Sequence, residues 1–250
     1  MKNYNNILEI KELDISISEI KILKNFNLII NKGAIHVIMG KNGSGKSTFS
    51  KVIAGHPAYT ILNGGMLFNN KNIADLNPET RSLLGIFLAF QYPIEISGVS
   101  NEDFLRLAYN SKQLNKKLKE IGPIDFLSLI KDKLKIIDIN ASSLARNVNE
   151  GFSGGEKKRN EILQMMILNS SLSFLDETDS GLDIDALKII SKSINYFITK
   201  NKSIVIITHY KRILDYTNPD FIHIMHNGRI IKSCDYSLAS ELEIIGYKLN

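Results

Sequence analysis

The chain has 250 residues, 44% of them hydrophobic and 23% charged, which is the balance of an ordinary globular protein. The net charge of +5 comes mostly from scattered lysines, a pattern that favours a solvated surface over a nucleic-acid-binding patch. The single cysteine, Cys234, excludes an intramolecular disulfide and leaves this chain alone without the thiolates that hold an iron–sulfur cluster. Apolar runs stay below the roughly 20 residues that cross a bilayer, so we expect no direct membrane insertion.

The N-terminal part of the chain is predicted to consist mainly of strands around one glycine-rich loop. Alternating or continuous apolar residues predict these strands, and a helix is predicted over residues 46–54, after the loop. Asn77 and Pro78 are typical of a helix cap followed by a first-turn proline. In chain order, the predicted strands are residues 7–17, 24–30, 34–39, 64–68 and 86–90.

Strand signals fade over residues 101–169, where we predict a mostly helical insert. Ser100 or Asn101 can cap its first helix, and Gly122-Pro123 interrupts the pattern before more helix follows. Strands alternate with helices again after the insert, so the sequence indicates an α/β fold.

The last part of the chain ends in a hairpin, because Asn227-Gly228 is a preferred two-residue turn between strands. In chain order, the predicted elements are a strand over 172–175, a helix over 183–200, a strand over 204–208 and a hairpin of 221–225 with 229–232.

The strongest motif fits the pattern G-x-x-x-x-G-K-[ST] between a predicted strand and a predicted helix. Its glycines let backbone N–H groups curl around phosphate oxygens, and the following helix adds the positive end of its dipole. Lys46 is expected to reach the β- and γ-phosphates of ATP, and the Ser47 hydroxyl to ligate Mg²⁺. The predicted nucleotide-binding residues of this P-loop are Gly40, Lys41, Asn42, Gly43, Ser44, Gly45, Lys46, Ser47 and Thr48.

A P-loop of this kind needs a second motif, and residues 172–177 provide an apolar strand that ends in two carboxylates. Asp176 is predicted to hold Mg²⁺, and Glu177 to polarise the attacking water as a general base. An Asp-Glu pair alone is more often a strand-end turn, but its place after a P-loop favours the catalytic interpretation. Ser173 is an unusual polar residue in this strand and must find a hydrogen bond if it is buried.

Further motifs resemble those of the ABC ATPase family, in the family's order. Residues 152–156, Phe-Ser-Gly-Gly-Glu, correspond to the family signature, usually Leu-Ser-Gly-Gly-Gln, at the start of a predicted helix. The resemblance implies that Ser153, Gly154 and Gly155 contact the γ-phosphate bound by a second ATPase subunit. Each monomer would then supply half of each site.

Three single residues extend the resemblance. It implies that Gln91 lies in a Q-loop that touches Mg²⁺ or water and senses partner contacts. It also implies that Asp183 belongs to a D-loop across the dimer and that His209 is the switch histidine at the γ-phosphate. A lone histidine after a strand is more often structural, but the order of the motifs in this chain favours the switch histidine. The predicted catalytic residues are Glu177, His209 and Gln91, and the predicted metal ligands are Ser47, Gln91 and Asp176.

The same resemblance implies the fold, a P-loop ABC ATPase core with an antiparallel β subdomain and an inserted α-helical subdomain. We expect one domain over residues 1–250. Residues 1–95 and 171–250 would form the catalytic and β lobe, and residues of about 96–170 the helical lobe that carries the signature.

Two positions depart from the usual family pattern. Many members stack adenine on an aromatic residue of the early strands, but residues 15–22 contain none, which would weaken ATP binding and base selectivity. Phe152 and Glu156 replace the usual ends of the signature. A carboxylate near the phosphates of the opposite subunit would slow closure of the pair.

The sequences around the motifs resemble one branch of the family, the SufC-type ATPases of the SUF system for iron–sulfur cluster assembly. The segments on which this resemblance rests are residues 55–57, 87–93, 98–106, 155–164 and 176–187. The branch implies pairing with a second copy in the ATP-bound state and SufB- and SufD-like scaffold proteins as partners, docked near residues 91–104. The ATPase of a membrane ABC transporter would share every ATP-site residue and is the alternative.

The sequence also favours a compartment. Residues 1–9 resemble neither a signal peptide nor a transit peptide. The richness in Ile, Asn and Lys is typical of AT-biased coding, so we expect a plastid-encoded protein of the plastid stroma, with the bacterial cytoplasm as the alternative.

Overall fold

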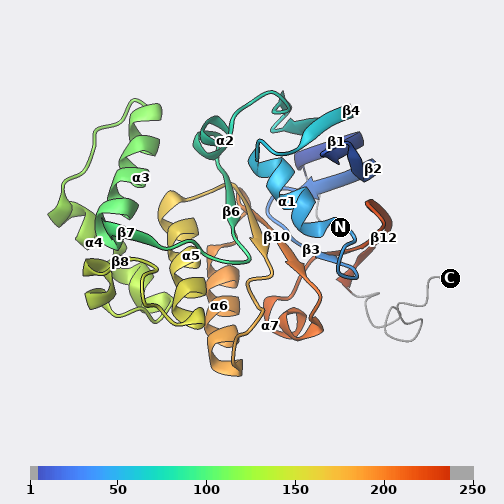
Figure 1. Cartoon of the computed structure of the whole chain (residues 1–250). Helices are drawn as coiled ribbons and strands as arrows, with labels where there is room; N and C mark the ends of the chain where they lie inside the picture. Colours follow the sequence, from blue (N-terminus) through green and yellow to red (C-terminus); the bar gives the residue numbers. More distant parts are fainter. Residues whose placement is uncertain (1–4, 237–250) are drawn as a thin grey trace.

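The computed structural model describes residues 5–236, which form two main β-sheets flanked by helices (Figure 1). The larger sheet has the strand order β12-β11-β3-β10-β9-β6, the smaller has the order β2-β1-β4-β5, and β7 pairs with β8. Residues 1–4 and 237–250, the ends of the expected domain, lie outside this range. The strands are β1 (Asn6–Ile17), β2 (Ile20–Asn31), β3 (Ile35–Met39), β4 (Thr60–Phe68), β5 (Lys71–Asn72), β6 (Ile86–Ala89), β7 (Ile96–Ser100), β8 (Asn147–Val148), β9 (Leu172–Asp176), β10 (Ser203–Thr208), β11 (Phe221–His226) and β12 (Arg229–Asp235).

The helices occupy two parts of the molecule. α1 and α2 lie near the smaller sheet, whereas α3 to α6 gather on the other side of the larger sheet (Figure 1). The helices are α1 (Lys46–Ala54), α2 (Pro78–Leu84), α3 (Asn101–Asn115), α4 (Pro123–Ile136), α5 (Gly154–Leu168), α6 (Ile184–Phe197) and α7 (Leu214–Thr217), with short 3-10 helices at Ala141–Ala145 and Lys211–Ile213.

The larger sheet is the centre of the fold. Its strands β11, β3, β10, β9 and β6 run parallel, and β12 closes one edge in the antiparallel sense. Parallel sheets are buried on both faces, and every residue of β3, β9 and β10 is buried. Alternate residues therefore enter different cores: Ile204 and Ile206 belong to one, Val205 and Ile207 to the other.

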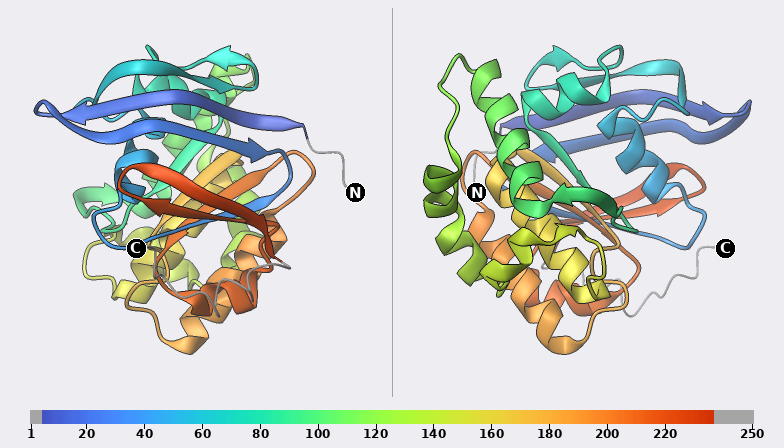
Figure 2. Two further views of the ribbon diagram at one scale, coloured as in Figure 1. Left: turned by 90° about the vertical axis from the view of Figure 1, so that its right-hand side faces the viewer. Right: turned by 60° about the vertical axis from the view of Figure 1, so that its left-hand side comes forward.

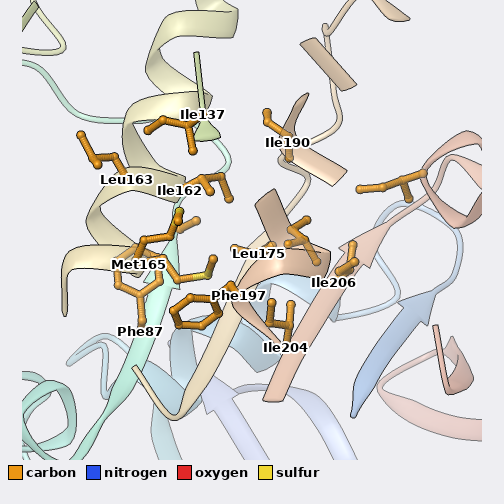
Figure 3. Packing of buried hydrophobic residues seen from close by; sticks show 14 of the residues in the cluster. Phe87, Ile137, Ile162, Leu163, Met165, Leu175, Ile190, Phe197, Ile204 and Ile206 are labelled. Carbon is orange, nitrogen blue, oxygen red and sulfur yellow. The ribbon is translucent and has the colours of Figure 1, made fainter. Parts of the chain in front are cut away.

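One face of the central sheet packs against the helices of the insert and α6. Figure 3 shows this core from close by, with strand residues meeting side chains of α5 and α6. Burial of these large apolar side chains is the main stabilising contribution of the contact. The labelled residues include Phe87, Leu175, Ile204 and Ile206 from the sheet and Ile162, Leu163, Met165, Ile190 and Phe197 from the helices.

The other face packs against α1 and the smaller, antiparallel sheet. Phe49 of α1 lies between the sheets, with ring centroids 4.8 Å from Phe26 of β2 and 5.6 Å from Phe174 of β9. Figure 2 shows the antiparallel sheet, in blue and cyan, on the opposite side of the central sheet from α6. The helix that follows the P-loop is thus fixed between two sheets.

Most predicted elements are confirmed. α1 begins and ends at the predicted residues, and Asn77 caps α2 by accepting a hydrogen bond from Thr80 N at 2.8 Å. Ser100, rather than Asn101, caps the first helix of the insert. The buried Ser173 finds its partner in Ser170, with the two hydroxyl oxygens 2.6 Å apart.

Several details differ from the sequence prediction. β2 and β4 each begin four residues before the predicted strands, and β5 and α7 were not predicted. The helix predicted over 183–200 ends at Phe197, because Ile198 is extended and Thr199 forms a β-bridge with Lys202 before β10. The insert also contains the short strands β7 and β8, which no periodicity indicated. Within residues 5–236, none of the helices has both the length and the apolar character needed to cross a bilayer.

Candidate functional site

The P-loop joins β3 to α1 at the carboxyl end of the central strand. Gly43 and Gly45 have φ angles of 78° and 103°, in the left-handed region that glycine tolerates best. Gly40 is required for a different reason, because a Cβ there would lie 2.2 Å from the Met225 carbonyl oxygen of β11. Ser44 is buried, and its hydroxyl has no hydrogen-bond partner within the described residues. Curled N–H groups and an unpartnered hydroxyl fit a phosphate group.

Exposure varies along the loop in a regular way. Lys41, Asn42 and Gly43 are exposed at its crest, the next three residues are buried, and Ser47 and Thr48 are half-buried in the first turn of α1. The turn between β11 and β12 contacts the backbone of the loop.

In that turn, Gly228 N donates to the Ser44 carbonyl at 2.9 Å, and Lys24 N donates to the Gly228 carbonyl at 3.0 Å. A Cβ at Gly228 would lie 1.9 Å from the Ile22 carbonyl oxygen, so the approach is as close as backbone allows. The P-loop is therefore bound to the last hairpin of the described chain.

The Lys46 side chain lies inside its own loop. Its Nζ donates to the carbonyls of Gly40 at 2.8 Å and Lys41 at 3.1 Å. Burial lowers the pKa of Lys46, while the nearby Glu177 and Asp176 carboxylates raise it. The ammonium group is thus placed at the loop that fits phosphate.

Asp176 ends β9 beside the first turn of α1. Ser47 Oγ donates to its Oδ1 at 3.1 Å, and Ser50 Oγ donates to its Oδ2 at 3.0 Å. Burial raises the pKa of this carboxyl group, and the neighbouring Glu177 charge raises it further. A hydroxyl and a carboxylate are hard oxygen ligands, so the donor set of Ser47 and Asp176 fits Mg²⁺. The contact of Ser50 with Asp176 was not predicted. Its position three residues after Ser47, on the same face of α1, is the sequence signal that could have indicated this contact.

The three predicted catalytic side chains meet at Glu177. Gln91 Nε2 donates to Glu177 Oε2 at 2.6 Å. His209 Nδ1 lies 3.4 Å from Glu177 Oε1, within ion-pair distance but not aligned for a hydrogen bond. Glu177 has φ of 47°, a strained conformation of the kind that concentrates at functional sites, and its N–H donates to Ile207 O at 2.9 Å.

A buried carboxylate outside the prediction fixes the loop that carries His209. Thr208 Oγ1 donates to Asp179 Oδ2 at 2.6 Å and accepts a hydrogen bond from Tyr210 N at 2.9 Å. Burial raises the pKa of Asp179. The rings of His209 and Tyr210 lie 3.9 Å apart between centroids. Only spatial pairing reveals this contact, because 29 residues separate Thr208 from Asp179.

The signature residues form the first turn of α5 and are bonded within it. Ser153 Oγ accepts from Glu156 N at 3.3 Å, and Glu156 Oε2 accepts from Ser153 N at 2.7 Å, which makes a capping box. That N–H keeps the pKa of Glu156 below its usual value. The carboxylate that departs from the family pattern is thus bound to its own helix. Gly154 is exposed, and a Cβ there would meet nothing within 4 Å.

Asp183 caps α6, because its Oδ1 accepts a hydrogen bond from Ala186 N at 2.7 Å. A Cβ on Gly155 would lie 3.8 Å from Ala186 Cβ and 4.0 Å from Leu182 Cδ2, so the starts of α5 and α6 are neighbours. Within residues 5–236, no hydrogen bond or ion pair joins Ser153 or these neighbours to the P-loop. The predicted site residues therefore fall into two separate groups.

Comparison with known proteins places these motifs in a family. The family model described as ABC transporter matches residues 23–180. The chain is 65% identical over 242 residues to "Probable ATP-dependent transporter ycf16" of Trieres chinensis, covering 97% of this chain and 96% of the relative. It is 52% identical to "ABC transporter I family member 6, chloroplastic" of Arabidopsis thaliana, covering 97% of this chain and 72% of that protein.

Solved structures agree in fold. An ATP-binding subunit of an ABC transporter superposes with a TM-score of 0.78 at 24% identity, covering 96% of this chain and 95% of its own. A dimeric post-hydrolysis ATP-binding cassette bound to ADP and Pi gives a TM-score of 0.77 at 21% identity, covering 91% and 98%. The family match, the close relatives and the site geometry lead to one conclusion: the chain belongs to the ABC ATPase family and is an ATP-binding, ATP-hydrolysing cassette.

Proposed function

We propose that this cassette is the ATPase of a SUF-type iron–sulfur cluster assembly complex, in which nucleotide-dependent pairing of two copies rearranges a scaffold. The observation that carries the proposal is the resemblance of the sequences around the motifs to SufC-type ATPases, above all at residues 87–93, 155–164 and 176–187. A second candidate, the ATPase subunit of a membrane ABC transporter, is favoured by the description of the relatives as transporters. The ATP chemistry is the same in both roles.

In that chemistry, the P-loop holds the phosphates of ATP through its N–H groups and Lys46. Ser47 and Asp176, with Gln91 beside them, would hold Mg²⁺. When bound, the ion supplies neutralisation of charge on the phosphate oxygens. Hydrogen bonds from Ser47 and Ser50 already fix the Asp176 carboxylate in place.

Glu177 is the proposed general base. The bond from Gln91 Nε2 to Oε2 orients its carboxylate, and the ordered loop at Thr208 places His209 on the side of Oε1. A base held this way can take a proton from the attacking water without first reorganising. Gln91 and His209 thus act on the base and on the γ-phosphate from β6 and β10, the two strands on either side of β9.

The signature group works in the second copy of the pair. The first turn of α5 presents backbone N–H groups and the positive end of a helix dipole on an exposed surface around Gly154. We propose that this turn and Asp183 contact the nucleotide bound by the opposite P-loop. Removal of the γ-phosphate by hydrolysis then releases the pair.

The partner surface is proposed to lie at the Q-loop. Tyr92 is 80% exposed and Ile94 62% exposed, directly after the Gln91 that bonds to Glu177. Exposed apolar side chains at such a position are typical of a protein interface. We assign this surface to SufB- and SufD-like scaffold proteins and the location to the plastid stroma, for which the chloroplastic relative is support. The bacterial cytoplasm is the alternative.

The test is affinity purification of the tagged chain from its native source, with mass spectrometry of soluble and membrane fractions. SufB- and SufD-like proteins in the soluble fraction are the expected result. Multispanning membrane proteins in their place would make the transporter role correct. A Tyr92→Ser, Ile94→Ser variant is the matched control, because it leaves the ATP site intact and should lose either kind of partner.

A further inference from the structure

The helix that carries the signature also binds the Q-loop backbone. Glu161 Oε1 accepts a hydrogen bond from Phe90 N at 2.8 Å. Lys158 Nζ donates to the Phe90 carbonyl at 3.1 Å and to the Gln91 carbonyl at 2.6 Å. Side chains one turn apart on α5 therefore satisfy three backbone polar groups of two consecutive residues where the Q-loop begins.

The far end of the Q-loop is tied to the same helix. Asn160 Nδ2 donates to Asn149 Oδ1 at 2.9 Å, and Asn149 Nδ2 donates to the Ile94 carbonyl at 2.7 Å. Asn160 also exchanges hydrogen bonds with Asn101 at 2.8 and 3.2 Å. The segment between Phe90 and Ile94 is consequently anchored at both ends by buried side chains.

These anchors are costly for the stability of the fold. Glu161 is 3% exposed and Lys158 6% exposed, and burying charges lowers stability unless they are well paired. Burial raises the pKa of Glu161 to about 7 and lowers the pKa of Lys158. Within the described residues, Glu161 Oε2 has no hydrogen-bond partner. Apolar replacements would leave the backbone groups of Phe90 and Gln91 without these partners, so the buried charges are tied to one position of the Q-loop, which fits a positioning role.

We propose that Lys158 and Glu161 are positioning residues that fix the Q-loop backbone, and through Gln91 the Glu177 carboxylate, to the signature helix. The inference rests on the catalytic roles proposed above for Gln91 and Glu177. It gives the exposed surface at Tyr92 a short route to both halves of the nucleotide site. A partner that moves the Q-loop must move α5, the base, or both.

The test compares Lys158→Met and Glu161→Leu with Lys112→Met in the full chain. Lys112 is a matched control, because its Nζ donates to the Leu168 carbonyl at the other end of α5 at 2.6 Å and burial also lowers its pKa, to about 8. We expect kcat for ATP to fall about tenfold or more in the first two variants, with KM within about twofold. Lys112→Met should keep kcat within about twofold at a comparable loss of Tm.

Two further readouts separate positioning from simple loss of stability. Hydrogen exchange of the Phe90 amide should become about tenfold faster in Glu161→Leu, and kcat should recover in Glu161→Gln, whose amide oxygen can accept the same N–H. Unchanged kcat in Lys158→Met and Glu161→Leu, or an equal fall in Lys112→Met, would overturn the inference.

Gln91→Ala distinguishes this failure from failure of the proposed function. Loss of kcat in Gln91→Ala with normal kcat in the anchor variants leaves the catalytic role standing and overturns the anchoring alone. Full kcat in Gln91→Ala overturns the catalytic role on which the inference rests, and the positioning claim falls with it.

Discussion

The two halves of the nucleotide site differ in how far one chain completes them. The P-loop half is built by tertiary contacts: Asp176 is buried and bonded to two serines, and Gln91 meets Glu177 from another strand. The signature half is local, because Ser153 and Glu156 bond to each other within the first turn of α5 and Glu156 also pairs with the nearby Arg146, whose Nη1 lies 3.9 Å from Oε1. The exposed signature turn makes no hydrogen bond or ion pair with the P-loop within the described residues. We therefore expect its proposed function to come from contact with another molecule.

Substitution of the proposed base in the P-loop half should cause the largest fall in kcat for ATP hydrolysis. Glu177→Gln keeps the hydrogen bond with Gln91 available but removes the group that takes a proton from water. We expect ATP binding to remain within about twofold and kcat to fall by about 10²-fold or more. Steady-state ATPase assays and equilibrium nucleotide binding measure the two quantities. Wild-type turnover in this variant would exclude Glu177 as the base.

Substitution in the signature half should abolish activity without harming the monomer. Gly154→Glu adds a side chain where a Cβ meets nothing, and an acidic group in the first turn of a helix interacts favourably with its dipole. We expect an unchanged or slightly raised Tm, and a fall of about 10²-fold in ATPase activity because the carboxylate opposes the phosphates of the other subunit. Thermal unfolding and ATPase assays test both parts.

Mixing two inactive variants sharpens the same comparison. Lys46→Ala lacks a working P-loop and Gly154→Glu lacks a working signature, so a mixed pair contains one site with both defects and one intact site. About a quarter of wild-type activity should return on mixing, since half of randomly formed pairs are mixed and each has one good site. No recovery, with pairing demonstrated by sedimentation, would show that the site is not shared between copies.

The free energy of unfolding should depend strongly on a substitution in the P-loop half and weakly on one in the signature half. In Gly40→Ala the new methyl group meets the Met225 carbonyl, so the free energy of unfolding should fall by about 1–3 kcal/mol. Gly154→Ala, with open space around its Cβ, should change it by about 0.5 kcal/mol or less. Urea unfolding of the two variants measures the difference. Equal values would mean that both halves are equally supported by the fold.

Two histidines of the larger sheet, on β3 and β11, give the last expected effect, a pH dependence of the free energy of unfolding. His36 Nε2 accepts from Asn31 N at 3.0 Å, His36 Nδ1 lies 2.9 Å from His223 Nε2, and His223 Nδ1 lies 2.8 Å from Ser233 Oγ. This chain of bonds is satisfied by neutral rings. Burial lowers the pKa of His223 to about 4, and burial with the neighbouring His223 lowers the pKa of His36 well below its usual value.

The sign follows from where the proton binds. Unfolded histidine takes up a proton near pH 6.5, before the folded rings do, so stability is complete above about 6.5 and is lost as pH falls toward 4. We expect about 1 kcal/mol less stability per histidine at about pH 5.5 than at about pH 7.5, measured by urea unfolding. His223→Gln, whose amide can accept and donate in the same places, should show a smaller change. An identical change would exclude His223 as its source.

The elements that sequence predicted best are those whose signals are local. The P-loop helix, the Asn77 cap and the Asn227-Gly228 hairpin each depend on a few neighbouring residues, and all three are confirmed. The family resemblance added the order of the motifs and so the expected meeting of Gln91, Glu177 and His209. The structure places these three side chains together.

The elements that sequence missed depend on contacts between distant residues. Glu161 and Lys158 looked like ordinary helical charges, and only the fold shows that they bind a loop some 70 positions earlier. The short strands β7 and β8 pair two segments that lie far apart in the sequence. β8 has only two residues, and β7 carries a glycine and two serines in place of an apolar run. Thr208 and Asp179 are likewise paired only by the neighbouring positions of β10 and β9 in the sheet.

The support of the P-loop by the β11–β12 turn has a consequence for synthesis of the protein. The loop is made early in translation, yet Met225 and Gly228, which shape it, follow more than 180 residues after Gly40. At ordinary elongation rates that delay is roughly 10 to 40 seconds. A nascent chain therefore lacks the turn that supports the P-loop until its synthesis is nearly complete. We expect ATP binding, and the proposed pairing that depends on it, to begin only after that point.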